Sequence, residues 1–183
     1  MAKKAIILLA EGFEEIEAIS CIDILRRAEI NLTVVGIDDL IIKGSRSIEV
    51  KADKKLNEIS IESDACILPG GMPGAENLAK SGLVKKLLIQ LNNQEKIIAA
   101  ICASPAVVLA PLGILDNKIA TCYPGMEKDF SNSTTYKKQE VIIDKNIITS
   151  RGPATAMQFA LKIVEKLAGK EMSNKVAKAT LFK

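Results

Sequence analysis

The sequence contains no histidine, and only 3% of its residues are aromatic. Without an imidazole, neither a Cys–His nor a Ser–His–Asp arrangement can form within the chain, and zinc sites built on histidine are excluded. Few aromatic side chains, with no basic residues interleaved among them, argue against a nucleic-acid-binding platform. Any proton carrier must therefore be Glu, Asp, Lys, Tyr, Cys or water.

Long apolar runs and paired cysteines are also missing. No segment approaches the ~20 apolar residues of a membrane span. The short apolar run after Lys3 and Lys4 is followed at once by glutamates, unlike a signal peptide. The four cysteines are widely spaced and form no C-x-x-C pair: Cys21, Cys66, Cys102 and Cys122. We therefore expect a cytoplasmic chain with free thiols, no membrane segment and no metal site.

The composition is that of a globular protein: 183 residues, 48% hydrophobic, 26% charged, with a net charge of +3 from scattered basic residues. Short apolar runs alternate with helical patterns, which predicts one three-layer α/β domain over residues 1–183. We expect a flavodoxin-like or Rossmann-like sandwich with a mostly parallel sheet and a small hairpin over residues 40–51. Strands are expected at residues 5–9, 32–35, 65–68, 97–101, 119–122, 142–143 and 147–149. Helices are expected at residues 14–28, 75–80, 83–92, 104–112, 154–167 and 175–178.

Cys102 lies where the buried run Ile97–Ile101 ends and Ala103-Ser104-Pro105 leads into an apolar helix. A sulfur at such a corner lies near the unpaired N–H groups of the helix start, which favour thiolate over thiol. The layout is that of a nucleophile elbow, with Cys in place of Ser. The alternative is a small buried hydrophobic residue, as we expect for Cys66 and Cys122.

Glu17 falls on the apolar arc of the first predicted helix, whereas Glu15 falls on its polar arc. An inward carboxylate is desolvated, which favours its protonated form. Such an acid can donate a hydrogen bond to a thiolate or shuttle a proton. The alternative is that Glu17 only favours the helix N-terminus electrostatically. Glu14 lies at the helix start, where capping accounts for it.

Gly70 and Gly71 directly follow a predicted buried strand. Two adjacent glycines allow close backbone approach and leave N–H groups free to face an anion. The pattern fits an oxyanion pocket, a phosphate cradle or a tight turn. Tyr123 follows another strand and is expected to line the same pocket. Arg151 follows the strand at residues 147–149 and is expected either to bind a carboxylate or to pair with a structural acid.

Four segments in order resemble the ThiJ/PfpI superfamily, most closely its parkinsonism-associated deglycase branch, which includes the bacterial protein YajL. The segments are Glu11–Glu17, Leu68–Gly71, Ala99–Pro105 and Thr149–Pro153. The resemblance implies a flavodoxin-like homodimer with a nucleophilic, oxidation-prone Cys102 and a protonated partner, Glu17. It also implies oxyanion donors at Gly70, Gly71 and Ala103. The positions that it assigns to the dimer interface are Glu14, Asp23, Arg27 and Arg46.

The activities attributed to the family are cofactor-free conversion of methylglyoxal or glyoxal to hydroxy acids, removal of early glycation adducts, a redox-responsive chaperone role and, in one branch, proteolysis. Many members place a histidine near the cysteine, where this chain has Ala120–Pro124. Because amide cleavage needs a general acid for a poor leaving group, the departure argues against proteolysis.

We therefore expect a cysteine-dependent glyoxalase/deglycase that acts on small reactive carbonyls or glycated side chains. The rival hypothesis is a redox-sensing chaperone in which Cys102 is oxidised to a sulfinic acid without turnover. A third is a nucleotide- or phosphate-binding module that uses Gly70 and Gly71.

Overall fold

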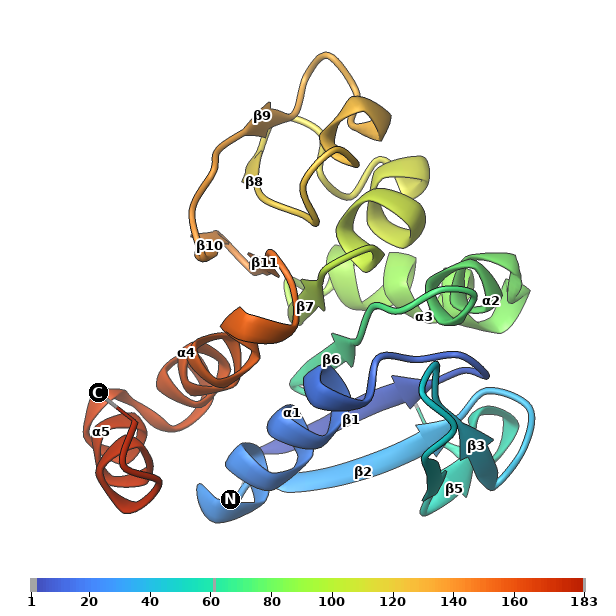
Figure 1. Cartoon of the computed structure of the whole chain (residues 1–183). Coiled ribbons are helices and arrows are strands. Elements are labelled where there is room, and N and C mark those ends of the chain that lie inside the picture. Colours follow the sequence, from blue (N-terminus) through green and yellow to red (C-terminus); the bar gives the residue numbers. More distant parts are fainter. Residues whose placement is uncertain (1–2, 61, 183) are drawn as a thin grey trace.

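The computed structural model describes residues 3–60 and 62–182. Within these ranges a seven-stranded sheet forms the centre of the molecule (Figure 1). Its strands are β1 (Lys4–Leu9), β2 (Asn31–Gly36), β5 (Lys54–Lys55), β6 (Ala65–Leu68), β7 (Ile97–Ile101), β10 (Val141–Asp144) and β11 (Ile147–Ser150). The helices are α1 (Glu15–Arg27), α2 (Gly74–Lys80), α3 (Gly82–Asn93), α4 (Ala156–Ala168) and α5 (Lys170–Ala179).

The order of strands in the sheet is β10-β11-β7-β6-β1-β2-β5. All neighbours pair in parallel except β10, which pairs antiparallel with β11. The central five strands therefore have the flavodoxin order, in which the chain winds outward in both directions from β1 and β6. Ligands in such folds bind at the carboxyl ends of the strands beside this switch point.

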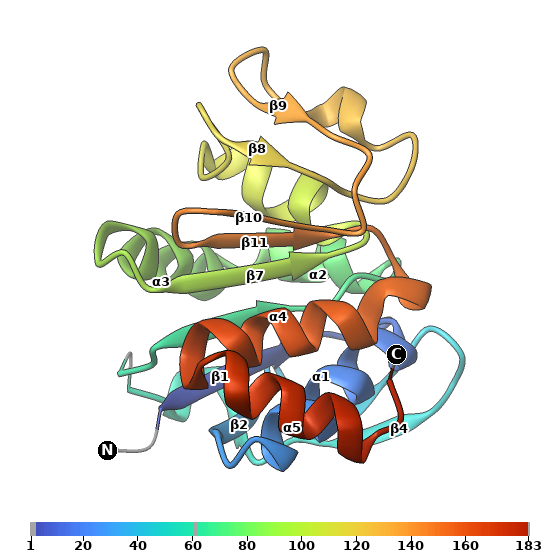
Figure 2. The same cartoon turned by 90° about the vertical axis from the view of Figure 1, so that its left-hand side faces the viewer.

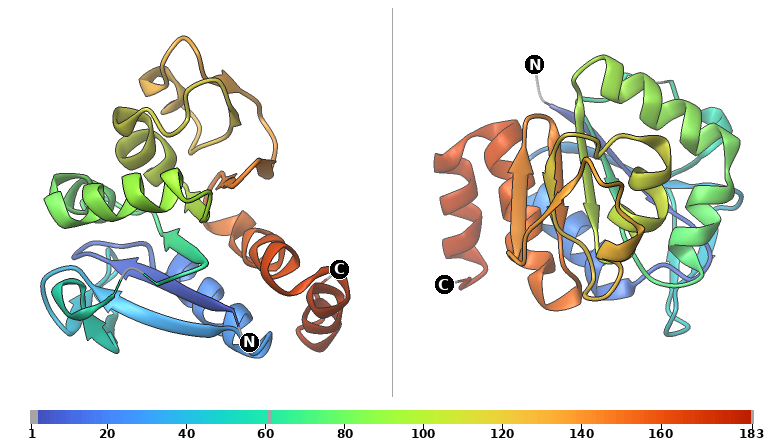
Figure 3. Two further views of the ribbon diagram at one scale, coloured as in Figure 1. Left: turned by 180° about the vertical axis from the view of Figure 1, so that it is seen from behind. Right: turned by 90° about the horizontal axis from the view of Figure 1, so that it is seen from above.

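The sheet is buried on both faces because its strands are apolar on both sides. In β1, Ile7 and Leu9 pack in the cluster that includes α1, α4 and α5, whereas Ile6 and Leu8 pack in the cluster that includes α2 and α3. Figure 2 shows α1, α4 and α5 in front of the sheet with α2 and α3 behind it. Seen from above, α5 lies outside α4 (Figure 3). The predicted three layers are thus confirmed.

A small hairpin is formed by β3 (Ile41–Lys43) and β4 (Glu49–Lys51), as the sequence predicts. The region expected as a strand at residues 119–122 is shorter, since only β8 (Ile119–Ala120) forms. It pairs with β9 (Thr135–Tyr136) outside the main sheet. The strand ends at Ala120 because the next N–H, of Thr121, donates to the Thr149 hydroxyl at 3.0 Å. The last helix is longer than expected, over the whole of α5.

The segment after β7 also departs from the prediction of an α-helix over residues 104–112. It forms a π-helical turn (Pro105–Leu109) followed by a 3₁₀ turn (Ala110–Leu112). Pro111 explains the change, because it lacks an N–H and its ring excludes a regular i→i−4 hydrogen bond. Gly113, with φ of 67°, then ends the segment in the left-handed conformation.

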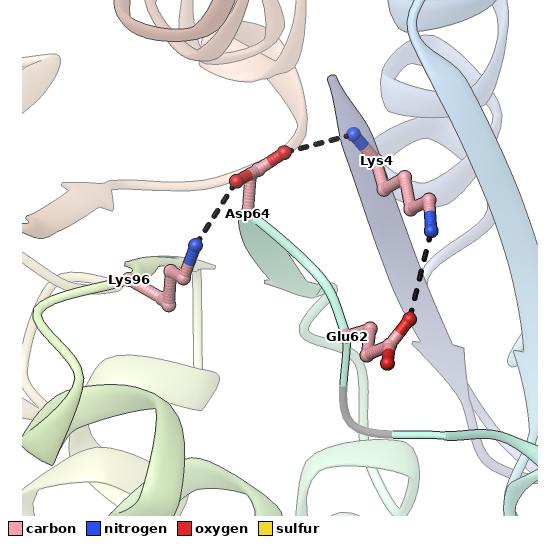
Figure 4. Close-up of polar contacts among 4 residues, drawn as sticks. All are labelled: Lys4, Glu62, Asp64 and Lys96. Atoms are coloured by element: carbon pink, nitrogen blue, oxygen red, sulfur yellow. Dashed lines mark hydrogen bonds and ion pairs between the residues drawn. The ribbon is translucent and has the colours of Figure 1, made fainter. Parts of the chain in front are cut away.

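Charged groups gather at the amino ends of the strands (Figure 4). Asp64, which directly precedes β6, accepts hydrogen bonds from the backbone N–H of Lys4 at 3.1 Å and from Lys96 Nζ at 3.1 Å. Lys4 Nζ in turn lies 3.7 Å from Glu62. The hydrogen bond from Lys4 lowers the pKa of Asp64 against the opposing effect of burial, and Lys96 lowers it further. This acid is therefore ionised and paired.

Among the described residues, no helix is both long enough and apolar enough to cross a lipid bilayer.

Candidate active site

Cys102 lies at a sharp corner between β7 and the π-helical turn. Its backbone has φ of 63°, a left-handed conformation that is uncommon outside glycine. Hydrogen bonds on both sides hold the corner: Cys102 N donates to Ser150 O at 3.0 Å, and Tyr123 N donates to Cys102 O at 2.8 Å. Cys102 retains 9% exposure, whereas the other three cysteines are fully buried. The nucleophile-elbow geometry expected from the sequence is thus present.

Glu17 projects from the first turns of α1 and is fully buried. Its Oε2 accepts a hydrogen bond from Gly70 N at 2.7 Å, while Oε1 is buried with no hydrogen-bond partner among the described residues. Burial raises the pKa of Glu17 to about 7, although the Gly70 N–H and the nearby Cys102 thiol act in the opposite direction. The carboxyl group therefore changes its protonation state near neutral pH.

Gly70 is where the thiol and the carboxyl group meet. A β-carbon on Gly70 would lie 2.6 Å from Cys102 Cβ, 2.9 Å from Glu17 Oε2 and 3.0 Å from Ala103 N. Such separations leave no room for any side chain at position 70. The absence of a β-carbon is thus what allows α1, β6 and the Cys102 corner to converge.

The protonation of Cys102 differs from the sequence-based prediction of a thiol ionised by a helix start. Burial raises the pKa of the Cys102 thiol, and the negative charge and hydrogen bond of Glu17 raise it further. Only the N–H groups of Gly71 and Ala103 lower it. The helix behind the sulfur is a single π-helical turn, so burial outweighs its N–H groups. The resting pair is a thiol beside an acid that titrates near neutral pH.

Two of the three predicted oxyanion donors face the sulfur. The N–H groups of Gly71 and Ala103 lower the pKa of Cys102, so they stabilise negative charge there. The Gly70 N–H is instead engaged by Glu17, which corrects its expected role. Gly71 has φ of 87°, and a side chain there would collide with the backbone at Gly12, Phe13 and Glu14. The sharp turn at Gly71 thus requires glycine.

A pocket of about 660 Å³ opens above Cys102. Of the residues selected from the sequence, Cys102, Gly71, Ala103, Tyr123, Glu14 and Arg46 line it. Tyr123 is 49% exposed, and its ring lies along the pocket wall beside Gly152. The pocket has further lining residues that no sequence pattern indicates: Ser45, Met72, Pro124, Gly125, Met126, Lys128 and Asp129. No periodicity marks them, since most lie in irregular segments that tertiary structure brings together.

The residues expected at a dimer interface fall into two groups. Asp23 and Arg27 lie on the exposed face of α1, where Arg27 Nε donates to Asp23 Oδ2 at 2.7 Å. Glu14 and Arg46 lie at the pocket. Glu14 is the residue before α1, but its side chain makes no capping hydrogen bond, contrary to the expectation from sequence. It is instead 3.2 Å from Ser45 Oγ.

Arg151 makes no ion pair within the described residues, and its Nε is buried without a hydrogen-bond partner. Its charge lowers the pKa of Cys122, which burial and the nearby Glu127 and Asp129 raise to about 12. Neither of the two roles expected for Arg151 is therefore evident. Across residues 3–60 and 62–182, no cluster of three or more Cys, Asp or Glu side chains is placed to hold a metal ion.

These features define a class: an α/β sandwich with a cysteine elbow and a buried glutamate at the switch point of the sheet. The model of the DJ-1/PfpI family matches residues 3–166, and the chain belongs to this family. The family named from the sequence is thus confirmed, whereas the assignment to its YajL-like bacterial members stays a prediction.

Relatives match over almost the full length. Protein dj-1beta of Drosophila melanogaster is 42% identical over 99% of this chain and 98% of its own length. The structure of oxidised Toxoplasma gondii DJ-1 superposes with a TM-score of 0.95 at 41% identity and covers 99% of both chains. A Caenorhabditis elegans protein named glutathione-independent glyoxalase DJR-1.2 is 36% identical over 96% of this chain and 95% of its own.

Proposed function

We propose that the protein is a cofactor-free, cysteine-dependent glyoxalase/deglycase that acts on methylglyoxal and early glycation adducts. One observation carries the proposal: a thiol and a carboxyl group with a pKa of about 7 meet at Gly70 beneath an open pocket. A carboxyl group that titrates near neutral pH is suited to both accepting and returning a proton. The glyoxalase name of the Caenorhabditis elegans relative supports the same reaction class.

In the first step, Cys102 Sγ attacks the aldehyde carbon of methylglyoxal. The ionised form of Glu17 takes the thiol proton as the carbon–sulfur bond forms, so a free thiolate need not accumulate. The N–H groups of Gly71 and Ala103, which favour negative charge at the sulfur, stabilise the developing oxyanion. Protonation of the oxygen gives a hemithioacetal.

In the next steps, Glu17 removes the proton from the carbon that bears sulfur and delivers a proton to the neighbouring carbon. An enediol intermediate thus becomes a thioester of the 2-hydroxy acid, with no net gain or loss of electrons. Water then hydrolyses the thioester, releasing lactate and restoring the thiol. Oε1 of Glu17, which lacks another partner, is the atom placed to carry the proton.

The pocket is large relative to methylglyoxal itself. Its volume of about 660 Å³ falls within the ~300–1,000 Å³ typical of small-molecule sites. This space supports the deglycase half of the proposal, because an adduct on a Cys, Lys or Arg side chain brings the atoms of that side chain with the reactive carbonyl.

The test is lactate formation from methylglyoxal by purified protein in the absence of glutathione. Cys102→Ala should reduce the rate by about a thousandfold or more, since it removes the nucleophile. Cys66→Ala is the matched control, because it removes a fully buried thiol that does not line the pocket and should leave the rate within about twofold. Equal turnover by Cys102→Ala and the parent would refute the mechanism.

A second candidate function is redox sensing, with a chaperone role that depends on oxidation of Cys102 to a sulfinic acid. Its support is that Cys102 is the cysteine with residual exposure and that the N–H groups of Gly71 and Ala103 can stabilise an anion there. Intact-mass spectrometry after mild peroxide treatment separates the two. Gain of two oxygens at Cys102 without any carbonyl turnover would favour the sensor.

We also propose that the active form is a homodimer that pairs through α1. Ile16 and Ile19 are 56% and 43% exposed on this helix, and Ile41 and Ile48 of the adjacent hairpin region are similarly exposed. Exposed apolar side chains on two neighbouring elements favour association. Light scattering should give twice the mass of the chain, and Ile19→Glu should reduce it to one; a monomeric parent protein would refute the proposal.

A further inference from the structure

A second buried carboxylate lies two residues from Glu17 on α1, and the proposed chemistry does not use it. Glu15 is 4% exposed, although it falls on the arc of the helix that the sequence marks as polar. Its Oε1 accepts hydrogen bonds from Arg46 N at 2.6 Å and from Ile48 N at 3.4 Å. Its Oε2 lies 3.1 Å from Ser45 Oγ. These three partners all belong to the turn Gly44–Ile48 between β3 and β4.

The turn is folded closely over this carboxylate. Gly44 N bonds to Ile48 O at 2.9 Å and Ser45 N bonds to Phe13 O at 2.8 Å, so the turn is tied both to itself and to the segment before α1. A β-carbon on Gly44 would collide with the Glu15 carboxyl group. Burial acts against ionisation of Glu15, yet the N–H groups of Arg46 and Ile48 hold its pKa below its usual value. Glu15 is therefore charged and serves as the acceptor that this turn otherwise lacks.

The same turn forms part of the rim of the Cys102 pocket, through Ser45 and Arg46. The Arg46 guanidinium donates to Ser45 O at 3.2 Å and forms no ion pair among the described residues. Arg46 thus places a positive charge at the rim of the pocket, which the carboxylates of Glu14 and Asp129 also line. Because Glu15 binds the backbone N–H of Arg46, the starting point of that side chain is fixed relative to α1 and hence relative to Glu17.

We propose that Glu15 is a positioning residue that fixes the Gly44–Ile48 turn, so that Arg46 favours negatively charged reactants at Cys102. The inference depends on Cys102 being the accessible thiol of the pocket, and not on any turnover. It also predicts an effect of opposite sign to simple electrostatics. If only charge mattered, a neutral residue at position 15 would speed the reaction of Cys102 with anions, because a negative charge is lost. If the turn is released instead, Arg46 no longer stays at the pocket rim, and the reaction with anions slows.

The experiment compares alkylation of Cys102 by iodoacetate, which is anionic, with alkylation by iodoacetamide, which is neutral. Rates are followed by intact mass, and the site is mapped by peptide mass. Arg46→Ala should lower the iodoacetate/iodoacetamide rate ratio about threefold to tenfold. This is the size expected when one positive charge acts on an anion across a partly solvated pocket. Glu15→Ala should lower the ratio by a similar factor, and the double variant should fall no further.

Two comparisons separate positioning from general effects. Glu15→Gln retains an oxygen acceptor of the same shape and should keep most of the ratio. Glu14→Gln removes a charge from the pocket without touching the N–H groups of the turn, and it should raise the ratio. Because both reagents attack the same sulfur, their rate ratio cancels any change in the thiolate fraction, and circular dichroism shows that each variant is folded.

An unchanged or increased ratio in folded Glu15→Ala, or losses that add in the double variant, would overturn the proposal. If Glu15→Ala does not fold, as judged by circular dichroism, Gly44→Ala takes its place. It pushes the turn away from the carboxylate while leaving the charge of Glu15, and it should lower the ratio in the same way. An unchanged ratio in folded Gly44→Ala would then refute the role of the turn.

Discussion

The strand β6 has a carboxyl group at each of its ends, and the two groups have opposite properties. Asp64 precedes the strand, is half-buried and is satisfied by Lys96 and by the backbone of Lys4. Glu17 meets the other end at Gly70, is fully buried and has no cation beside it within the described residues. The pKa of Asp64 is lowered by its hydrogen bonds, whereas that of Glu17 is raised by burial.

The difference shows that one edge of the sheet holds a paired, ionised acid and the opposite edge holds an acid that can exchange its proton. At the amino end of β6, Asp64 is paired with Lys96 and bonded to the backbone of Lys4, and it stays ionised throughout the neutral range. At the carboxyl ends, burial without a cation leaves an acid whose proton is readily exchanged near pH 7. Substitutions at the two ends of β6 should therefore have very different consequences.

Replacing Glu17 with Gln should have the greatest effect on activity. The amide keeps the shape of the side chain but cannot take up or return a proton, so lactate formation from methylglyoxal should fall about 10²–10⁴-fold. Asp64→Asn, the same chemical change at the opposite end of β6, should leave the rate within about twofold. Comparable losses in the two variants would mean that the contrast has no catalytic meaning.

The two carboxyl groups should also give stability opposite dependences on pH. Because the folded-state pKa of Glu17 is raised to about 7, its contribution is present at low pH and is lost as the pH rises through about 7. The expected loss is at most about 3 kcal/mol. Urea unfolding of the parent and of Glu17→Gln at pH 5 and pH 8 measures it: the parent should lose stability relative to the variant as the pH rises.

For Asp64, whose folded-state pKa is lowered, the sign reverses. Its contribution is present above the pKa of the unfolded chain and is lost as the pH falls. Asp64→Asn should therefore differ from the parent least at acidic pH. A parent protein that matched both variants across the whole pH range would contradict the proposed environments.

Gly70→Ala tests whether the two groups need their close approach. The added methyl group should destabilise the fold by about 1–3 kcal/mol, since it lies against Cys102, Glu17 and the backbone of Ala103. Gly82→Ala is the control, because nothing lies within 4 Å of a β-carbon at that position on α3. It should be neutral or slightly stabilising in the same denaturation measurement.

The smallest effect is expected at the amino ends of the strands. Lys4→Ala breaks the ion pair between Lys4 and Glu62, whose side chains are 55% and 77% exposed, respectively. The free energy of unfolding should fall by less than about 1 kcal/mol. The cost should shrink further in high salt. A loss comparable with that of Gly70→Ala would show that this end of the sheet is less tolerant than its exposed charges indicate.

Much of this arrangement could be predicted from the sequence because it depends on local patterns. Apolar runs predict the main parallel strands, and the break after Ile101 predicts the corner at Cys102. Helical periodicity predicts that Glu17 points toward the core. The opposite result for Glu15 has a non-local cause. Its position on the helix was correctly predicted as lying away from the sheet, but the turn after β3 folds over it.

The ionisation of Cys102 was predicted wrongly for a similar reason. The sequence shows the helix start but not how completely α1 and β6 enclose the sulfur, and enclosure determines the direction of its pKa shift. The π-helical turn was also not predicted, although Pro111 within the expected helix indicates irregular backbone. Pocket residues such as Lys128 and Asp129 lie in irregular segments, where no periodicity could identify them.

The left-handed backbone at Cys102 has a consequence for how this protein can evolve. A side chain in that conformation costs the folded state roughly 1–2 kcal/mol relative to glycine, so the fold would gain stability by losing its sulfur. Selection for thermal robustness alone would therefore favour an inert chain with glycine at the corner. A cysteine at this corner therefore lowers the stability of the fold in exchange for a reactive thiol.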